Sequence, residues 1–406
     1  MSDTPSPAAG PAPARLLSLD VFRGATIAAM MLVNNPGDWG AVYAPLLHAP
    51  WHGWTFTDTI FPFFLWIVGV AIPLSVARRL EQGQRRRDLF RHALRRALIL
   101  FGVGFLLNSF GYLLTALVEE PGWNAFWHHY LTTIRLPGVL QRIAVCYLAA
   151  VALFLTTDVK GQVRWLVGLL LGYWLLMKLV PVPPPTGMGE AVAGSLAMEH
   201  NLAHFIDHLL LNGPRIGRHV WAQTATWDPE GVLSTLPAIG TALFGLLTGQ
   251  LLRSARTPAE KTAWILAGGA ILAWVGQLMN LAFPINKPLW TSSYAVFMAG
   301  LAMLTFGTTY WLVDVRGHRR WAQPLAIYGM NAITVYVVSW LLADLLTRLT
   351  WATPAGRVGL KSLLYGSLLA PLPSAHLASL LWGLLWVLLL FAVALVMYRR
   401  RWFVRF

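Results

Sequence analysis

The sequence predicts an all-α protein, a polytopic integral membrane bundle of about ten transmembrane helices. Three observations lead to this prediction. Hydrophobic residues fill 56% of the 406 positions and charged residues only 12%, about half the charged share of a typical globular domain. Runs of about 18 or more apolar residues, long enough to cross a bilayer as helices, recur along the chain. These runs are rich in Leu, Ala and Gly and lack the alternating pattern of an outer-membrane barrel.

The apolar runs divide the chain into ten expected spans. They cover residues 16–34, 57–77, 96–117, 137–157, 163–182, 234–252, 262–283, 291–313, 323–345 and 376–398. Residues 1–14 are rich in Pro, Ala and Ser without an apolar core, so we expect a disordered cytoplasmic tail rather than a signal peptide. Residues 15–406 are then a single transmembrane domain. Cys146 is the only cysteine, which excludes an intrachain disulfide.

The net charge of +14 follows from where the basic residues lie. If the N-terminus is cytoplasmic, most of the 31 lysines and arginines fall in cytoplasmic segments, including eight arginines between Arg78 and Arg96 and four from Arg399 onward. This bias is the positive-inside rule, which puts both termini in the cytoplasm of a cell with an inner membrane. Basic loops beside anionic lipid account for the charge, so no nucleic-acid partner is expected.

Ionisable residues inside apolar spans require a reason, because a charge at the centre of a membrane helix costs about 2.5–3.5 kcal/mol on insertion scales. Asp20 and Arg23 are three residues apart and can pair on one helix face, as a structural ion pair or a functional one. Arg142 lies near the start of a span. It either snorkels to the outer surface or binds an anion such as phosphate or carboxylate.

The first outside loop is rich in Trp and Pro and contains His48 and His52. A histidine in a partly dry, aromatic-lined pocket favours its neutral form, as a general base must; a hydrogen-bonded interfacial histidine is the alternative. We discount a metal site, because Pro50 interrupts the helical spacing of the two histidines and no carboxylate accompanies them. The following Thr55-Phe-Thr-Asp58 predicts a helix capping box.

Several stretches then occur in an order that matches a known family. They are Ser-Leu-Asp20-Val-Phe-Arg23-Gly, Leu-Val-Asn34, His48-Ala-Pro-Trp51-His-Gly, Asp58 through Phe-Pro-Phe-Phe to Gly69, Arg135-Leu-Pro-Gly-Val-Leu-Gln-Arg142, Asp228-Pro-Glu230-Gly, Asn286-Lys287-Pro-Leu-Trp290 and Gly329-Met-Asn331. On these residues the chain resembles the heparan-α-glucosaminide N-acetyltransferase-like transmembrane acetyltransferases, including their bacterial, NagX-type members.

The resemblance implies transfer of an acetyl group from cytoplasmic acetyl-CoA to the amine of a glucosamine-like sugar on the periplasmic side of a bacterial inner membrane. The catalytic histidine of the family corresponds to His48, and an assisting asparagine corresponds to Asn34, with Asn35 as a rival. His52 stands where the lysosomal member of the family has asparagine, which weakens the case for a catalytic role of His52. Relatives suggest a homodimer.

The same resemblance suggests binding residues. Arg23, Arg142 and Lys287 are candidate cations for coenzyme A or a substrate anion. Trp51 and Trp290 suit the apolar face of a sugar, although an interfacial Trp belt is the commoner reason for such residues. The acids Asp58, Asp228 and Glu230 are candidates for the ammonium or the sugar hydroxyls, and the alternative is that they cap or begin helices.

Two other functions remain open from the residues. An O-acyltransferase acting on an envelope glycan would use the same base on a hydroxyl. A sugar transporter would explain the ten helices, but it should show repeat symmetry and broken helices with polar groups at the midplane. The acceptor, and the choice between direct transfer and an acetyl-histidine intermediate, are not decided by the residues.

Overall fold

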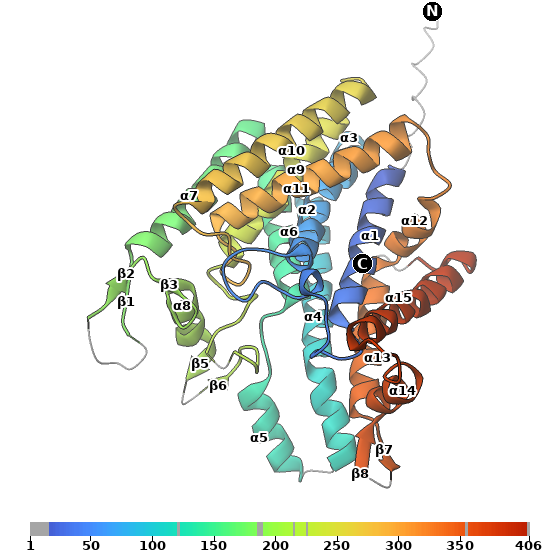
Figure 1. Cartoon of the computed structure of the whole chain (residues 1–406). Helices are drawn as coiled ribbons and strands as arrows, with labels where there is room; N and C mark the ends of the chain where they lie inside the picture. The colour runs from blue at the N-terminus through green and yellow to red at the C-terminus, as the bar shows by residue number, and fades with distance from the viewer. Residues whose placement is uncertain are drawn as a thin grey trace, which may run out of the picture.

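The computed structural model describes residues 16–119, 122–184, 190–213, 216–224, 226–353 and 356–403. The tail expected at residues 1–14 lies outside these ranges. The described chain is a bundle of long helices with short two-stranded hairpins gathered toward one end (Figure 1).

The helices follow the chain from α1 to α15. They are α1 Leu17–Asn34, α2 Phe56–Ile72, α3 Arg78–Glu81, α4 Arg86–Glu119, α5 Trp123–Thr133, α6 Val139–Thr156, α7 Val159–Leu179, α8 Leu202–Leu211, α9 Thr235–Arg253, α10 Pro258–Asn280, α11 Ser292–Tyr310, α12 Gln323–Met330, α13 Ala332–Arg348, α14 Leu360–Leu368 and α15 Ala375–Arg399. A 3-10 turn, η1, spans Ala44–Leu46, and π turns η2 Pro73–Ala77 and η3 Trp311–Val315 extend α2 and α11.

Four antiparallel hairpins complete the secondary structure of the described residues. They pair β1 Pro181–Val182 with β2 Val192–Ala193, β3 Leu196–Ala197 with β4 His200–Asn201, β5 Asn212–Gly213 with β6 Gly217–Arg218, and β7 Thr350–Thr353 with β8 Gly356–Gly359.

A helix occupies each of the ten expected spans within the described ranges, so the predicted fold class is confirmed: the chain is a multi-pass helical membrane protein. Eight of these helices are long and apolar enough to cross a membrane. A ninth span results if α12 and α13 count together, but the two are bent by 75° at Asn331. The continuous helix expected over 323–345 is therefore wrong. The remaining helix, α7, is 21 residues long and carries Lys160, Arg164 and Lys178.

Helices α2 and α9 approach closely at the centre of the bundle. A Cβ on Gly69 would lie 1.9 Å from the carbonyl oxygen of Ala242, and one on Gly245 would lie 2.0 Å from that of Trp66. Small residues of this kind let two membrane helices pack backbone against backbone. The contact brings the start of α2 beside the segment that leads into α9.

The helix ends predicted to be cytoplasmic meet one another. The backbone N–H of Ser18 donates to Asp314 at 3.1 Å, Arg253 pairs with Glu81, and Arg86 donates to the carbonyl oxygen of Leu155. Asp58 begins the same continuous helical segment that Glu81 ends, so about 35 Å separates the two along the helix. The loops before α2, α9 and α11 lie at the end of the bundle opposite this basic one.

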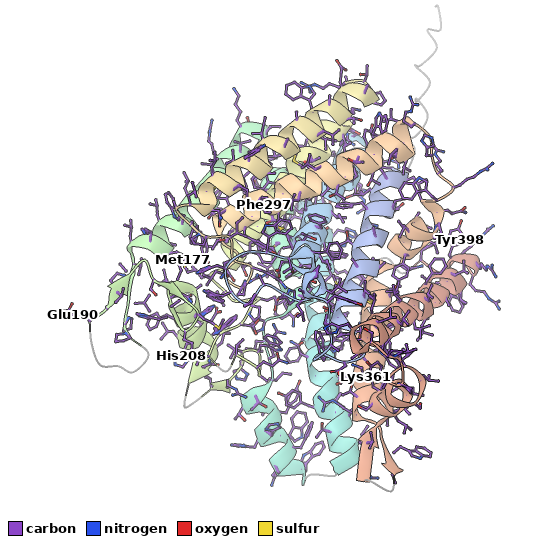
Figure 2. All side chains as sticks on the ribbon, in the orientation of Figure 1. Met177, Glu190, His208, Phe297, Lys361 and Tyr398 are labelled. Carbon is purple, nitrogen blue, oxygen red and sulfur yellow. The ribbon has the colours of Figure 1, made fainter. Side chains whose placement is uncertain are left out.

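The loop between α1 and α2, expected to lie outside, is held against the C-terminal helices. Lys361 of α14, labelled in Figure 2, donates to the carbonyl oxygen of Pro36 at 2.8 Å. The backbone N–H of Asp38 donates to the hydroxyl of Ser379 on α15 at 3.1 Å. These contacts give the loop a defined path over the bundle before it reaches His48.

Candidate active site

His48 and Asp58 form the centre of the candidate site. Nδ1 of His48 lies 2.6 Å from Oδ1 of Asp58. The Asp58 side chain is 1% exposed, whereas that of His48 is 52% exposed. A hydrogen bond to a carboxylate requires the proton on Nδ1, which leaves Nε2 as the acceptor nitrogen. His48 thus does have a carboxylate beside it, contrary to our expectation that none accompanies the loop histidines, because Asp58 comes from the next helix.

Asp58 is fixed by its position at the start of α2. Oδ2 accepts the backbone N–H groups of Ala49 and Thr55, each at 3.0 Å, and the carbonyl oxygen of Asp58 accepts the hydroxyl of Tyr294 at 2.6 Å. The predicted capping box of Thr55 and Asp58 is present. One carboxyl oxygen therefore caps the helix while the other orients His48. Its burial favours this orienting role over the direct substrate contact that we expected of Asp58.

Lys287 lies against the same imidazole. Its Nζ is 3.0 Å from both ring nitrogens of His48 and 3.8 Å from Oδ1 of Asp58, and its side chain is 17% exposed. Burial lowers the pKa of the Lys287 ammonium, and the charge of Asp58 opposes that effect. The structure thus brings three of the candidate residues, His48, Asp58 and Lys287, into one cluster.

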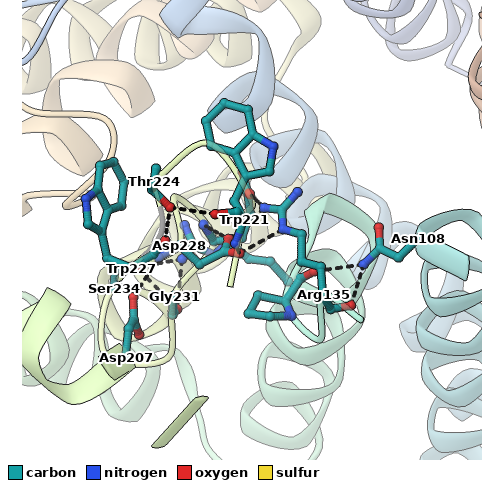
Figure 3. Close-up of polar contacts among 12 residues, drawn as sticks. Asn108, Arg135, Asp207, Trp221, Thr224, Trp227, Asp228, Gly231 and Ser234 are labelled. Carbon is teal, nitrogen blue, oxygen red and sulfur yellow. Dashed lines mark hydrogen bonds and ion pairs between the residues drawn. The ribbon is translucent and has the colours of Figure 1, made fainter. Parts of the chain in front are cut away.

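A second charged cluster surrounds Arg135 (Figure 3). Its Nε and Nη2 donate to the two carboxyl oxygens of Asp228 at 2.7 and 2.6 Å, and it also pairs with Glu230. Asn108 holds the backbone of Arg135 by donating to its carbonyl oxygen at 2.9 Å. Asp228 is buried and accepts the backbone N–H of Trp221 as well. Its oxygens are thus occupied by the chain, whereas Glu230 is less enclosed.

Asp207 on α8 anchors the loop that carries these acids. Its carboxyl oxygens accept the backbone N–H groups of Val232 at 2.8 Å and Asp228 at 3.3 Å. Burial raises the pKa of Asp207 to about 7, and the two backbone hydrogen bonds oppose the rise.

Arg142 does not snorkel to the surface; it is 2% exposed. Nη2 donates to the carbonyl oxygen of Gly231 at 2.9 Å and to the hydroxyl of Ser234 at 2.5 Å. The guanidinium lies 5.1 Å from the ring centroid of Trp290. Nε and Nη1 are buried and have no hydrogen-bond partner within the described part of the chain, so they are donors available to a bound acceptor.

The two candidate tryptophans differ in their surroundings. Trp290 is 1% exposed, donates its indole N–H to Thr241 at 3.1 Å and has Arg142 over its ring. It is part of the packed core. Trp51 is partly exposed, donates to the carbonyl oxygen of Leu196 at 2.9 Å and packs edge-on against Trp227. A sugar contact is sterically easier at Trp51.

Other candidates lie apart from the cluster. Asn34 is exposed, and in the ranges that the structure describes its carboxamide makes no hydrogen bond, to His48 or otherwise. The rival Asn35 donates to the carbonyl oxygen of Met31 at 2.9 Å. His52 is exposed and lies 3.4 Å from the amide of Asn286. Arg23 pairs with Asp20 at 3.3 Å, near the opposite end of the bundle.

Two features of the site were missed by reasoning from the sequence. Arg135 belongs to one of the motifs shared with the family, but the motif alone does not identify Arg135 as the partner of Asp228 and Glu230. The bond between His48 and Asp58 was also missed, although both residues belong to adjacent motifs. The available signal for the first was that Arg135, Asp228 and Glu230 all belong to the motifs shared with the family.

Comparison with known proteins identifies relatives over most of the chain. The heparan-alpha-glucosaminide N-acetyltransferase of Homo sapiens is 32% identical over 365 residues, covering 80% of this chain and 52% of the relative. That of Mus musculus is 30% identical over 380 residues, covering 81% and 55% respectively. The chain spans about half the length of these curated relatives. No family model matches the chain.

Proposed function

We propose that this chain, a homologue of the heparan-alpha-glucosaminide N-acetyltransferases, transfers an acetyl group from acetyl-CoA to the amine of an amino sugar. The family resemblance drawn from the motifs is confirmed by those relatives; the bacterial inner membrane and the periplasmic acceptor stay predictions. The observation that carries the proposal is the bond between His48 and the buried Asp58. It leaves a half-exposed imidazole in which Nε2 is the nitrogen that can accept a proton.

The chemistry requires such a base. An ammonium is not nucleophilic, so the sugar reacts as the neutral amine after its ammonium proton is lost to solvent, and the nitrogen must lose one further proton as it attacks the thioester carbonyl. Nε2 of His48 accepts that proton, and the Asp58 carboxylate stabilises the imidazolium that forms. The imidazolium then gives the proton to the sulfur as the C–S bond breaks, so the products are the N-acetyl sugar and free coenzyme A.

The proposed donor extends through the bundle toward the basic end. Arg142 and Lys287 lie near the reacting end and Arg23 near the other. We infer that Arg23 binds the nucleotide part, and that the unpaired Nε and Nη1 of Arg142 bind an acceptor oxygen of the donor or of the sugar. Trp51 and Glu230 are the proposed contacts of the sugar ring and its ammonium, and Asn34 is the proposed assisting residue.

A sugar transporter is the second candidate, because the break between α12 and α13 at Asn331 resembles the discontinuous helices of transporters. The charged clusters, however, come from the start of α2 and the loops before α6, α9 and α11 rather than from this break.

The test is to incubate purified protein with acetyl-CoA and glucosamine and to measure free coenzyme A and N-acetylglucosamine together. His48→Ala should lower turnover by about 10²–10⁴-fold, the usual contribution of a positioned base, and should leave coenzyme A binding intact. His52→Ala is the matched control and should stay close to wild type. Near-normal turnover in His48→Ala, or a larger loss in His52→Ala, refutes the proposal.

A further inference from the structure

Lys287 places a positive charge beside the proposed base, and the proton transfer does not need it. Asp58 already orients His48 and balances the imidazolium. An ammonium 3.0 Å from both imidazole nitrogens disfavours a second positive charge on that ring. Because the ammonium in this position repels the imidazolium that forms on His48, its placement indicates that Lys287 has a role in the reaction that His48 and Asp58 do not supply.

The loop that carries Lys287 is rigidly built. Asn286 is fully buried, donates to the carbonyl oxygen of Trp51 at 3.0 Å and accepts the backbone N–H of Leu289 at 2.8 Å. The backbone N–H of Gly53 donates to the carbonyl oxygen of Ile285 at 2.7 Å. Trp290 closes the turn with a φ of 48° and a buried indole. The loop before α11 is thus tied to the loop that carries His48, so Lys287 and His48 hold a fixed relative position.

A purely structural ion pair does not explain this placement. Nζ is 3.8 Å from Asp58 but 3.0 Å from the ring nitrogens of His48. Asp58 also already accepts hydrogen bonds from Nδ1 of His48 and from two backbone N–H groups. Binding of the donor's phosphates does not explain it either, because the pantetheine arm separates those phosphates from the thioester, which in the proposed arrangement reacts beside His48.

We propose that Lys287 is a catalytic residue whose ammonium stabilises the oxyanion that forms on the acetyl carbonyl oxygen. This inference rests on the proposed acetyl transfer. In the resting site Nζ donates to Nε2 of His48. When the amine takes that place, the ammonium is free to donate to the thioester oxygen, which must lie next to the attacked carbon and hence next to the base.

Lys287 keeps its positive charge throughout the proposed reaction. The amine lone pair forms the C–N bond, the π electrons of the C=O bond move to oxygen, and His48 takes the amine proton. The oxyanion next to the ammonium then re-forms the C=O bond, the C–S bond breaks, and the sulfur leaves with its electron pair and receives the proton from His48. Stabilising the intermediate charge with a preorganised donor lowers the barrier without any net proton loss from lysine.

The oxyanion role predicts that activity is lost at alkaline pH. Only the ammonium form serves this role, so activity is lost as pH rises through the pKa of Lys287. Burial lowers that pKa, as does Arg142, while Asp58 and Glu230 raise it, and His48 faces the same ammonium. The alkaline limb of kcat should therefore lie below the usual pKa range of lysine.

The experiment compares Lys287→Met and Lys287→Arg with Lys178→Met, the same change at an exposed lysine of α7. We expect Lys287→Met to lower kcat by about 10²–10³-fold, the effect of losing one oxyanion donor, with the KM for acetyl-CoA changed less than about threefold. Lys287→Arg should recover part of kcat and move the alkaline limb to higher pH, because arginine stays protonated. Lys178→Met should match wild type.

Different results would contradict the role of Lys287 and the proposed acetyl transfer. If Lys287→Met keeps the wild-type kcat, or raises only the KM for acetyl-CoA, the oxyanion role is overturned and the proposed transfer still stands. If Lys287→Met does not fold, Lys287→Arg decides: an unchanged alkaline limb overturns the inference. If wild-type protein transfers no acetyl group, the proposed function fails and this inference fails with it.

Discussion

Replacing Asp58 with asparagine keeps the size of the side chain but removes the charge that faces His48. A carboxamide has one oxygen and one NH₂ group, whereas the site presents two backbone N–H donors, from Ala49 and Thr55, on one side and Nδ1 of His48 on the other. If the amide oxygen keeps both N–H groups, the NH₂ faces Nδ1. Nδ1 must then accept, the ring proton moves to Nε2, and the nitrogen that should accept the amine proton is blocked.

The size of the expected loss of turnover follows from the other orientation of the amide at position 58, in which its NH₂ and oxygen are exchanged. Flipping the amide restores the productive tautomer but turns the NH₂ toward two partly buried N–H donors, at about 1–3 kcal/mol for each hydrogen bond lost. A total of about 2–6 kcal/mol leaves the productive orientation with a population lower by about 30-fold to about 10⁴-fold. Turnover of Asp58→Asn should fall by that factor, while the helix cap and the fold persist.

The assay is release of free coenzyme A from acetyl-CoA in the presence of glucosamine, with the melting temperature in detergent measured on the same samples. Asp38→Asn is the matched control, because Asp38 is an exposed aspartate of the same loop, and its carboxylate accepts the backbone N–H of Gly40 rather than a bond from His48. Turnover within about fivefold of wild type in Asp58→Asn, or an equal loss in Asp38→Asn, would refute the reasoning.

Three further predictions concern topology, the donor and packing. A periplasmic reporter such as alkaline phosphatase should be active when fused after residue 200 and silent when fused after residue 256; the reverse pattern would put His48 in the cytoplasm. Coenzyme A should raise the melting temperature of the purified protein by mass action, and no shift at saturating concentration would count against the acetyltransferase. Gly69→Val should destabilise the protein by about 1–3 kcal/mol or more, because a Cβ there meets the carbonyl oxygen of Ala242 at 1.9 Å, whereas Gly102→Val, where a Cβ meets nothing within 4 Å, should leave the melting temperature nearly unchanged.

Much of the architecture follows from the sequence alone. Long apolar runs must be helical in a bilayer, since every backbone polar group has to be bonded within its own segment. That local requirement predicts a helix at each of the ten expected positions, and Thr55 and Asp58 predict the start of α2 because a capping box involves only neighbouring residues. The break at Asn331 escaped prediction, because the residues on both sides of it are apolar and the 75° bend depends on packing against other helices.

The chemistry of the site was decided by the tertiary structure. Motifs show which residues matter to a family, and they pointed to His48, Asp228, Glu230 and Lys287 without saying which of them meet. Lys287 is 239 positions from His48 and Arg135 is 93 from Asp228, so no periodicity or local spacing joins them. They are brought together by the close contact of α2 with α9 and by the hydrogen bonds between the loops before α2 and α11. The physical reason is that a hydrogen bond or ion pair acts over about 3–4 Å, and only the packed chain brings distant residues that close.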